Sequence, residues 1–393
     1  VLLTERMVQP MDKPTVQDIF HRFYPAYLDQ YSPSPVQAKV AHNIMNCKTG
    51  AYGANVCVCE DCGFVQIHYN SCRNRCCPMC QAVPKEMWMD ARREDVLDAP
   101  YFHLVFTVPD ILNPVIYSNQ RLLYDALYHA ASSTISELTA DPKHLGAKVG
   151  YICILHTWGS EMNFHPHIHT ILLGGGLASN NQWKDNGENF FLPIRGISKM
   201  FRGKYLEELK RLWEEDKLVF HGTAEKFRNH YTFKELLDSC YGMDWIPHCK
   251  KTFNGAQTVI KYLGKYTHRI AVSNHRIVRM DDDTVTFLVK DYRNEGQWKE
   301  LTISGVEFVR RFLMHVPPRR FVRIRHYGLL CSRTKSQKLT LCRNLLGCKK
   351  YLSKLRDMEM PEILEHLYGI KVCVCKACGG HLGKPQMRMP LRC

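Results

Sequence analysis

The stretch that decides the fold is Phe164-His165-Pro166-His167-Ile168-His169-Thr170-Ile171-Leu172-Leu173, followed by Gly174-Gly175-Gly176. Side chains alternate between the two faces of a strand, so His165, His167 and His169 share one face while Ile168 points to the other. Two or three imidazoles on one strand can bind a divalent cation and leave positions open for substrate. A solvent-facing polar strand is the alternative, but the apolar run after His169 favours an interior strand. The stretch therefore predicts an interior strand that carries a metal site.

Strands and helices are expected to alternate on both sides of this strand. Aromatic and β-branched runs predict strands over 101–108, 148–157, 276–280, 284–290 and 297–303. Apolar residues at helical spacing predict helices over 114–138, 198–215 and 254–268. The polar stretch before 251 has no clear periodicity. The pattern predicts an α+β protein.

The helix expected over 254–268 carries two tyrosines, Tyr262 and Tyr266, four residues apart. This spacing puts both phenols on one helix face, where both can reach a single site. A phenol ionises only near pH ~10, so a nucleophilic tyrosine needs cations or a metal-bound phosphate nearby. Lys261 and Lys265 are interleaved with the tyrosines and are candidates for that role and for binding DNA. Tyrosines at helical spacing also pack commonly in cores, so the pair gains weight only beside the histidine strand.

The cysteines indicate structural zinc. The chain has 18 cysteines, and residues 1–20 contain no apolar core of signal length, so no secretory signal is expected. This favours a reducing compartment and metal-bound thiolates over disulfides. Cys59-x-x-Cys62 and Cys77-x-x-Cys80 have the spacing of a site in which two Cys-x-x-Cys turns hold one ion, with Cys72 and Cys76 as competing ligands. A further pair, Cys375-x-x-Cys378, lacks an obvious partner pair. Its possible completions are Cys373, His381 and Cys393.

Charge is concentrated after the histidine and tyrosine stretches. Fourteen Lys or Arg and one acid, Glu307, lie between Leu301 and Arg356, which accounts for +13 of the formal net charge of +15. Such a segment favours a polyanionic partner, with a solvated basic surface as the alternative. No run of ~18 apolar residues could span a bilayer, so a soluble cytoplasmic protein associated with the nucleoid is expected. The arginines expected to contact phosphates are Arg310, Arg311, Arg323 and Arg325.

These features suggest a linear organisation. An N-terminal helical and zinc-binding domain is expected over 1–98, a catalytic domain over 99–304 and a basic DNA-binding region over 305–393. No internal repeat or low-complexity segment interrupts this order.

Several blocks together resemble a known family. The block from Tyr69 to Arg75 with Cys77-Pro-Met-Cys80, and the run from Tyr101 to Pro109, resemble the transposase zinc-binding domain. The blocks 165–176 and 262–271, with the tail segments 307–313 and 323–328, resemble rolling-circle transposases of the insertion sequence 91 family. The resemblance covers about Cys47 to Gly347 in unchanged order. One departure is Cys76, where the family usually has histidine.

The resemblance implies a histidine-hydrophobe-histidine endonuclease: an antiparallel sheet with flanking helices, preceded by a small cysteine-rich zinc domain. On that pattern His167 and His169 bind Mg²⁺ or Mn²⁺, with His165, Glu161 or His103 as the third ligand. Tyr262 and Tyr266 would be the nucleophiles that cut and rejoin single-stranded DNA at element ends and target sites through 5′-phosphotyrosine. No nucleotide cofactor is expected.

Three other functions are compatible with these residues. A rolling-circle replication initiator or relaxase would use the same chemistry. A small-molecule metallohydrolase would place the histidines at the end of a barrel strand and leave the basic tail unexplained. A zinc-dependent DNA-binding regulator would have the same charge and cysteines without catalysis.

Overall fold

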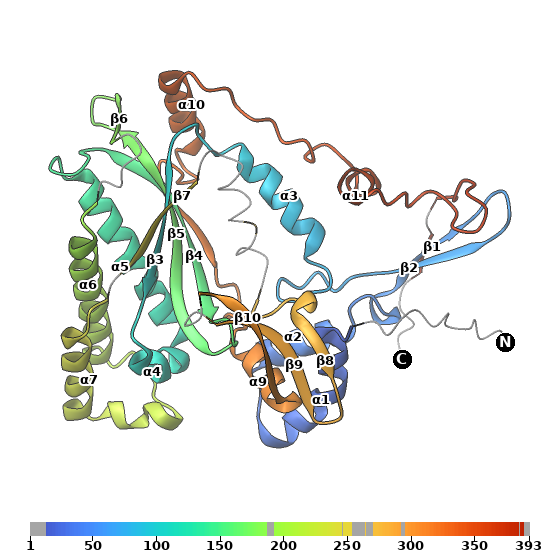
Figure 1. Ribbon diagram of the computed structural model, residues 1–393, viewed down its shortest axis with the longest axis horizontal. Coiled ribbons are helices and arrows are strands. Elements are labelled where there is room, and N and C mark those ends of the chain that lie inside the picture. Colours follow the sequence, from blue (N-terminus) through green and yellow to red (C-terminus); the bar gives the residue numbers. More distant parts are fainter. Residues whose placement is uncertain are drawn as a thin grey trace.

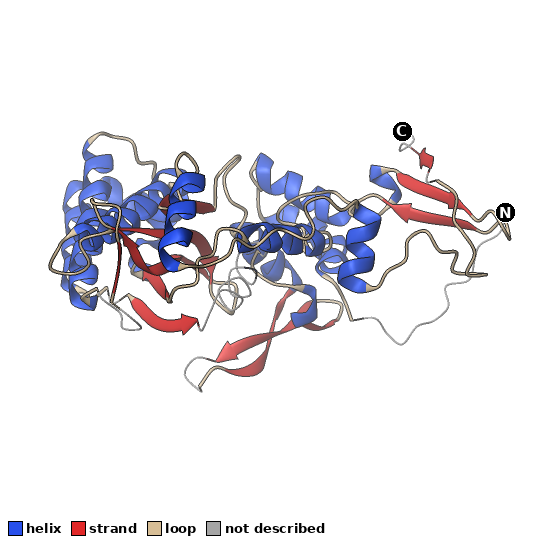
Figure 2. Ribbon diagram, turned by 90° about the horizontal axis from the view of Figure 1, so that it is seen from above, coloured by secondary structure: helices blue, strands red, loops and turns tan. Residues whose placement is uncertain are grey.

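The computed structural model describes residues 13–186, 192–245, 247–253, 264, 270–291, 295–384 and 386–388. Figure 1 shows a large sheet flanked by helices, a smaller unit of helices and strands beside it, and a thin ribbon that extends away from both. The view from above shows an elongated molecule with the ribbon at one end (Figure 2).

The central sheet has six strands, and all of its strand pairs are antiparallel. The strand order is β11-β4-β5-β3-β7, and β6 pairs with β5. The strands are β3 (Tyr101–Thr107), β4 (Lys148–Trp158), β5 (Phe164–Leu177), β6 (Trp183–Asp185), β7 (His248–Phe253) and β11 (Ile324–Gly328). The histidine stretch is β5, which lies between β4 and β3. The predicted α+β class and the interior position of this strand are confirmed.

The glycine triplet is part of β5, because the strand continues to Leu177. A Cβ at Gly175 would lie 2.4 Å from a ring atom of Trp183, and one at Gly176 would lie 2.5 Å from the carbonyl oxygen of Lys148. Residues without a side chain therefore let β6 and β4 approach the strand closely.

Four helices cover one face of the sheet (Figure 1). Ile168 and Leu172 of β5 point into the apolar core on this face. The helix predicted over 114–138 is divided at Asn119, whose side chain donates to the carbonyls of Val115 and Val219. The unassigned polar stretch contributes the last of these helices. They are α4 (Asn113–Ser118), α5 (Gln120–Ala140), α6 (Ile194–Glu214) and α7 (His230–Gly242).

The opposite face of the sheet has a smaller cover. Ile171 and Leu173 of β5 pack there with residues of α3 (Ala82–Arg93) and α10 (Lys335–Leu346). His167 and His169 share the parity of Ile171, so they belong to this face of the strand. The sheet thus has one largely apolar face and one face on which histidines replace apolar side chains at one end.

A second core lies beside the sheet. It combines N-terminal helices with a hairpin sheet from much later in the chain, and the strands predicted over 276–303 are confirmed. Capping boxes at Thr15 and Ser34 begin the two N-terminal helices. The elements are α1 (Val16–Gln30), α2 (Pro35–Met45), β8 (Ile277–Met280), β9 (Thr284–Asp291), β10 (Gln297–Ser304) and α9 (Gly305–Met314).

The ribbon joins the two ends of the chain. Its strand order is β12-β1-β2, with β1 (Ala54–Val58) and β2 (Val65–Tyr69) from the N-terminal part and β12 (Gln386–Arg388) from the C-terminal part. From α10 the chain passes over α3, continues through α11 (Met360–Tyr368) and reaches the ribbon (Figure 1).

The packing does not follow the linear division at 98 and 304. β8 to β10 pack with the N-terminal helices, β11 completes the central sheet from beyond 304, and β12 completes the ribbon. Strand pairing between distant segments explains this, since a lone strand satisfies its backbone only against a neighbour.

Candidate nuclease site

Three buried histidines converge on the end of the sheet that lacks an apolar cover. They are His156 of β4 and His167 and His169 of β5, and one ring nitrogen of each lies within 4.8 Å of the others. His156 is directly opposite His167 in the antiparallel register. His167 Nε2 and His169 Nε2 are 3.0 Å apart. The strand pairing therefore assembles a three-imidazole cluster from two strands.

Hydrogen bonds orient the two rings on β5. His167 Nδ1 lies 2.6 Å from the carbonyl oxygen of His165, which can only accept, so Nδ1 carries the proton and Nε2 presents a lone pair. His169 Nδ1 lies 2.9 Å from Nε2 of His103, which holds the other side of that ring. Burial lowers the pKa of His167 to about 4 and the pKa of His169 well below its ordinary value. Both rings are therefore neutral near pH 7, the state in which imidazole binds metals.

The donor set fits a divalent cation. A cation between two ring nitrogens that present lone pairs bonds to both. Bonds of about 2.1 Å at a right angle separate two donor atoms by about 3.0 Å, which is the Nε2 to Nε2 distance here.

The third member of the cluster differs from the sequence expectation. His165 is outside it: its partly exposed side chain lines the same cleft, with Nδ1 3.1 Å from Asp110 Oδ1. His103 contacts Nδ1 of His169 but is not a member of the cluster. Glu161 is not a member either. His156 was missed because a single histidine in a predicted strand has no pattern. Folding the predicted strands 148–157 and 164–173 as a hairpin pairs positions whose numbers sum to 321, which places 156 opposite 165 and on the same face as the other histidines. The observed register is shifted, with a sum of 323, and places 156 opposite 167.

The histidines line a cleft of about 890 Å³ between the sheet, α3 and the β8 to β10 hairpin sheet. The described residues that line it include Lys85, Arg276 and Lys290 and no Asp or Glu. Trp158 and Trp298 also line it, and Lys290 lies over the Trp298 ring at 5.3 Å. Trp298 is 54% exposed, and cationic walls with an exposed indole suit a polyanion that carries stackable bases.

The expected nucleophiles, Tyr262 and Tyr266, and the expected DNA contacts Lys261 and Lys265 lie outside the described residues. Gly264, two positions from each tyrosine, is described: it is helical, buried and part of the cleft lining. A Cβ on Gly264 would lie 1.9 Å from the sulfur of Met89, so this position packs against α3.

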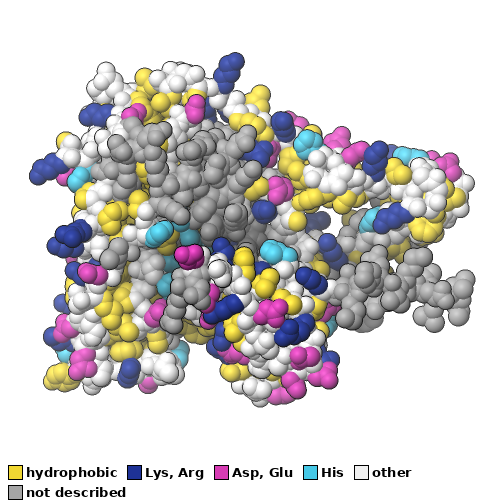
Figure 3. All heavy atoms as spheres, viewed as in Figure 1, with side chains coloured by type: hydrophobic (Ala, Val, Ile, Leu, Met, Phe, Trp, Pro, Cys, Tyr) yellow, Lys and Arg dark blue, Asp and Glu magenta, His cyan; other side chains and the backbone are white. Residues whose placement is uncertain are grey.

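The four arginines predicted to bind DNA have partners within the chain. Arg310 and Arg311 both bond to Glu307, at 2.5 and 2.7 Å. Arg325 pairs with Asp125 and lies over the Tyr128 ring at 4.0 Å, and Arg323 is buried. The face in Figure 3 shows Lys and Arg dispersed among Asp and Glu instead of gathered in one patch. Much of the basic tail therefore stabilises the fold, and the cations of the described cleft come from other segments.

The predicted set Cys59, Cys62, Cys77 and Cys80 does not form one site. The two pairs belong to separate clusters, because β1 and β2 extend Cys59 and Cys62 away from the main body, whereas Cys77 and Cys80 stay beside it. The first cluster is Cys47, Cys72, Cys77 and Cys80, with Cys72 and Cys80 sulfurs 3.8 Å apart.

This first cluster precedes the N-terminal end of α3. It lies in the core formed by the N-terminal helices and the β8 to β10 sheet, next to the cleft. Cys72, a competing candidate, takes part in it, whereas the adjacent candidate Cys76 does not. Burial raises the pKa of the Cys76 thiol to about 11, which keeps it neutral. The cluster therefore differs from the predicted set of zinc ligands in two of its four cysteines, and it offers the same four-thiol chemistry.

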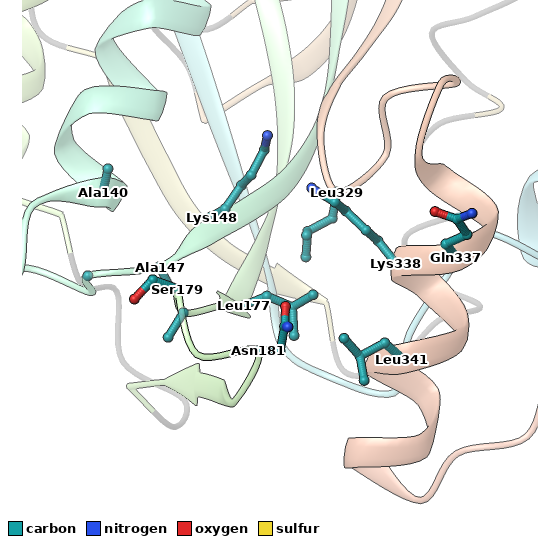
Figure 4. Close-up of a pocket in the computed structure, with 12 residues that line it drawn as sticks. Ala140, Ala147, Lys148, Leu177, Ser179, Asn181, Leu329, Gln337, Lys338 and Leu341 are labelled. Atoms are coloured by element: carbon teal, nitrogen blue, oxygen red, sulfur yellow. The ribbon is translucent and has the colours of Figure 1, made fainter.

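A separate hollow of about 480 Å³ lies at the edge of the sheet between β4, β5 and α10 (Figure 4). Its described lining includes Lys148 and Lys338 and lacks His, Cys, Asp and Glu. It therefore lacks the side-chain types that form the metal-ligating clusters elsewhere in the described residues. Among the described helices, none combines the length and apolar character needed to cross a bilayer.

Comparison with known families identifies two matching regions. Residues 150–338 match the family described as "Putative transposase", and residues 19–108 match the "Transposase zinc-binding domain". The first region contains the three clustered histidines and the second contains the first cysteine cluster.

Relatives match over most of the chain. The putative transposase y4qJ of Sinorhizobium fredii is 40% identical over 369 residues, which is 93% of each chain. The transposase for insertion sequence element IS801 of Pseudomonas savastanoi pv. phaseolicola is 30% identical, covering 77% of this chain and 72% of its own. A solved conjugative relaxase, TrwC with OriT DNA, aligns with a TM-score of 0.23 and 15% identity over 44% of this chain and 68% of its own. The chain belongs to the insertion sequence 91 family of transposases.

Proposed function

We propose that this transposase cuts and rejoins single-stranded DNA at the ends of its mobile element and at target sites through 5′-phosphotyrosine intermediates. The observation that carries the proposal is the position of three buried imidazoles in a cleft with cationic and indole walls and no described carboxylate. A DNA substrate also supports a location at the nucleoid.

His156, His167 and His169 would hold the catalytic ion. Imidazole is a softer ligand than carboxylate, so this set favours Mn²⁺ over Mg²⁺. When bound, the ion supplies positive charge that stabilises a scissile phosphate as negative charge develops on it. His103 would keep His169 in the orientation that presents Nε2 to the cluster.

Tyr262 and Tyr266 would be the nucleophiles, and Gly264 between them supports this because it lines the same cleft. The phenolic oxygen attacks phosphorus and the bond from phosphorus to the 3′ oxygen breaks. The tyrosine stays on the 5′-phosphate, and the 3′ oxygen takes a proton and leaves as a hydroxyl. The reverse step restores a phosphodiester, so the exchange needs no nucleotide cofactor.

Lys85 and Lys290 would hold phosphates, the buried Arg276 would add positive charge to the wall, and Trp158 and Trp298 would stack on bases. Stacking on indoles needs unpaired bases, which favours a single-stranded over a duplex substrate. Two backbone carbonyls hold Arg276 in place: its guanidinium donates to those of Leu288 and Ser160 at 2.7 and 2.6 Å.

The test uses labelled single strands from the element ends, with Mn²⁺ or Mg²⁺, and detects a protein–DNA adduct that survives denaturation. We expect the adduct with the wild type and its loss in Tyr262→Phe combined with Tyr266→Phe. An adduct in the double variant would refute the tyrosine mechanism. A protein that binds these strands and never forms an adduct would be the non-catalytic regulator instead.

The other readings separate on different grounds. A replication initiator or relaxase shares the chemistry, and the family of this chain speaks for transposition. The histidines lie within an antiparallel sheet and not at the end of a parallel barrel strand, so the metallohydrolase reading has no structural support.

A further inference from the structure

Two Cys-x-x-Cys-Gly turns from opposite ends of the chain meet at the tip of the ribbon. One contains Cys59 and Cys62, and the other contains Cys375 and Cys378. The sulfurs of Cys59 and Cys378 are 3.5 Å apart, those of Cys62 and Cys375 are 3.8 Å apart, and all four lie within 4.8 Å. More than 300 residues of sequence therefore separate the two halves of one cluster.

These separations match metal ligation. Four thiolates bound tetrahedrally at about 2.3 Å have sulfurs about 3.8 Å apart, whereas a disulfide joins sulfurs at about 2.0 Å. All four cysteines are free thiols.

The two turns have the same backbone design. The amide of Gly63 donates to the carbonyl of Cys59, and the amide of Gly379 donates to the carbonyl of Cys375, both at 3.0 Å. Both glycines have positive φ, 73° and 77°, which side chains strongly disfavour. This turn points two thiols from adjacent backbone towards one centre.

Backbone amides also point at the sulfurs of the C-terminal turn. The amide of Ala377 lies 3.4 Å from the sulfur of Cys375, and the amide of Gly380 lies 3.4 Å from the sulfur of Cys378. Donors directed at sulfur stabilise the thiolate, the form that binds metal. Asp61 links the turns, since its carboxylate accepts from the amide of His381 at 3.2 Å.

Little else holds the turns together. The apolar cluster around them consists of Cys57, Cys59, Cys375 and Leu382. Modules with so small a core require a disulfide or a metal to stay folded. The strand pairs are short: β12 joins β1 through three residue pairs, and one bridge links Cys59 with Leu382.

We propose that Cys59, Cys62, Cys375 and Cys378 bind a second zinc ion, which ties the C-terminal segment to the N-terminal ribbon. Both family matches end before Cys375, so neither assigns this site. The proposal does not depend on the nuclease function.

The second zinc also fixes a segment that crosses the wall of the cleft. Before reaching the ribbon, the chain is held on α3 by Asp90, which accepts from the hydroxyls of Tyr351 and Ser353, both at 2.6 Å, and from the amide of Leu355 at 3.0 Å. The zinc anchors the far end of this segment, so the C-terminal part forms a strap with two attachments.

Alkylation of the reduced full-length protein tests the site. Cys62, Cys373 and Cys378 are all exposed, but Cys373 is outside the cluster. Mass spectrometry should find Cys373 labelled at once, and Cys62 and Cys378 protected until a chelator removes the zinc. Exposure cannot explain such a difference. Labelling of all three at the same rate in zinc-loaded protein would overturn the proposal.

Metal analysis gives an independent measurement. The wild type should hold two zinc ions per chain, and Cys375→Ser combined with Cys378→Ser should hold one. The matched control Cys373→Ser, in the same loop, should keep two. One zinc in the wild type, or two in the double variant, would contradict the second site, and the alkylation result on the wild type stands even if the double variant misfolds.

Discussion

The central sheet and the cysteine ribbon are both antiparallel, yet they are stabilised in different ways. The sheet is packed on a large apolar core that contains fully buried aromatic side chains such as Phe106 and Tyr205. The ribbon has four core residues, and Val65, Ile67 and Tyr69 on β2 are all about half exposed. With the proposed ions bound, metal would have two roles in one chain: in the sheet it would serve chemistry on a scaffold that folds by packing, and in the ribbon it would replace the missing core.

The largest expected effect is at the histidine cluster. His167→Ala should reduce adduct formation by about 10³-fold or more, because several kcal/mol of charge stabilisation is removed. The free energy of unfolding of the His167→Ala variant should change little. The matched control is His165→Ala, two residues away and outside the cluster, which should keep most activity. Equal losses in the two variants would contradict the assignment of the ligands.

The second effect is on the stability of the sheet. Phe106→Ala removes a fully buried ring that lies 5.0 Å from the ring of Phe201, and should lower the free energy of unfolding by about 3–5 kcal/mol. Val65→Ala on the exposed side of the ribbon should change it by less than about 0.5 kcal/mol. Urea unfolding followed by circular dichroism measures both. Similar losses of unfolding free energy in the two variants would show that side-chain packing stabilises the ribbon as it does the sheet.

Zinc removal should separate the two regions. After chelation, amides of β1, β2 and β12 should exchange hydrogen for deuterium as in an unfolded chain, while β3, β4 and β5 keep their protection. Hydrogen exchange with mass spectrometry resolves both sheets in one sample. Continued protection of the ribbon would mean that its backbone pairing suffices without metal.

A smaller effect concerns the basic tail. Hydrogen bonds from Arg310 and Arg311 lower the pKa of Glu307 to about 2. The folded pKa is depressed, so the ion pairs stabilise the fold above the unfolded pKa and are lost as pH falls from about 4.5 towards 2. Glu307→Gln should remove about 1 kcal/mol of stability at pH 7 and flatten this part of the pH profile, since solvent screens a side chain that is 28% exposed. Glu235→Gln, on the exposed side of α7, serves as the control.

The smallest effect is on DNA affinity. Lys290→Gln should weaken single-strand binding and reduce the salt dependence of the binding constant by about one phosphate contact. Lys210→Gln on the outer side of α6 should leave both unchanged. Fluorescence anisotropy at several salt concentrations measures the slope. An unchanged slope for Lys290→Gln would remove this side of the cleft from the DNA path.

The accuracy of the sequence predictions differed between local and distant features. The histidine strand, the strands over 101–108 and 276–303 and the α+β class were predictable, because alternation and β-branched runs are local properties. The composition of each ligand set was not, because His156 and the pairing of Cys59 with Cys375 depend on which strands and turns become neighbours. The roles of Tyr262 and Tyr266 stay predictions.

The basic tail is a second region whose contacts the sequence did not predict. Its charge was visible in the composition, but the sequence could not tell that Arg310, Arg311 and Arg325 pair with acids and that Arg323 is buried. An ion pair depends on distances of a few ångströms between side chains, which the order of residues does not state when the partner is as far away as Asp125.

The sequence by itself determined the elements of this protein: the strand that carries His167 and His169, the Cys-x-x-Cys turns and the family of transposases whose blocks it shares. Only the tertiary structure decided which of these elements act together. It brought His156 opposite His167, divided the cysteines between two clusters and joined the two ends of the chain in one ribbon. The physical reason is that residue type and spacing set local backbone geometry, whereas a metal site or cleft requires several side chains to converge, which long-range strand pairing and packing achieve.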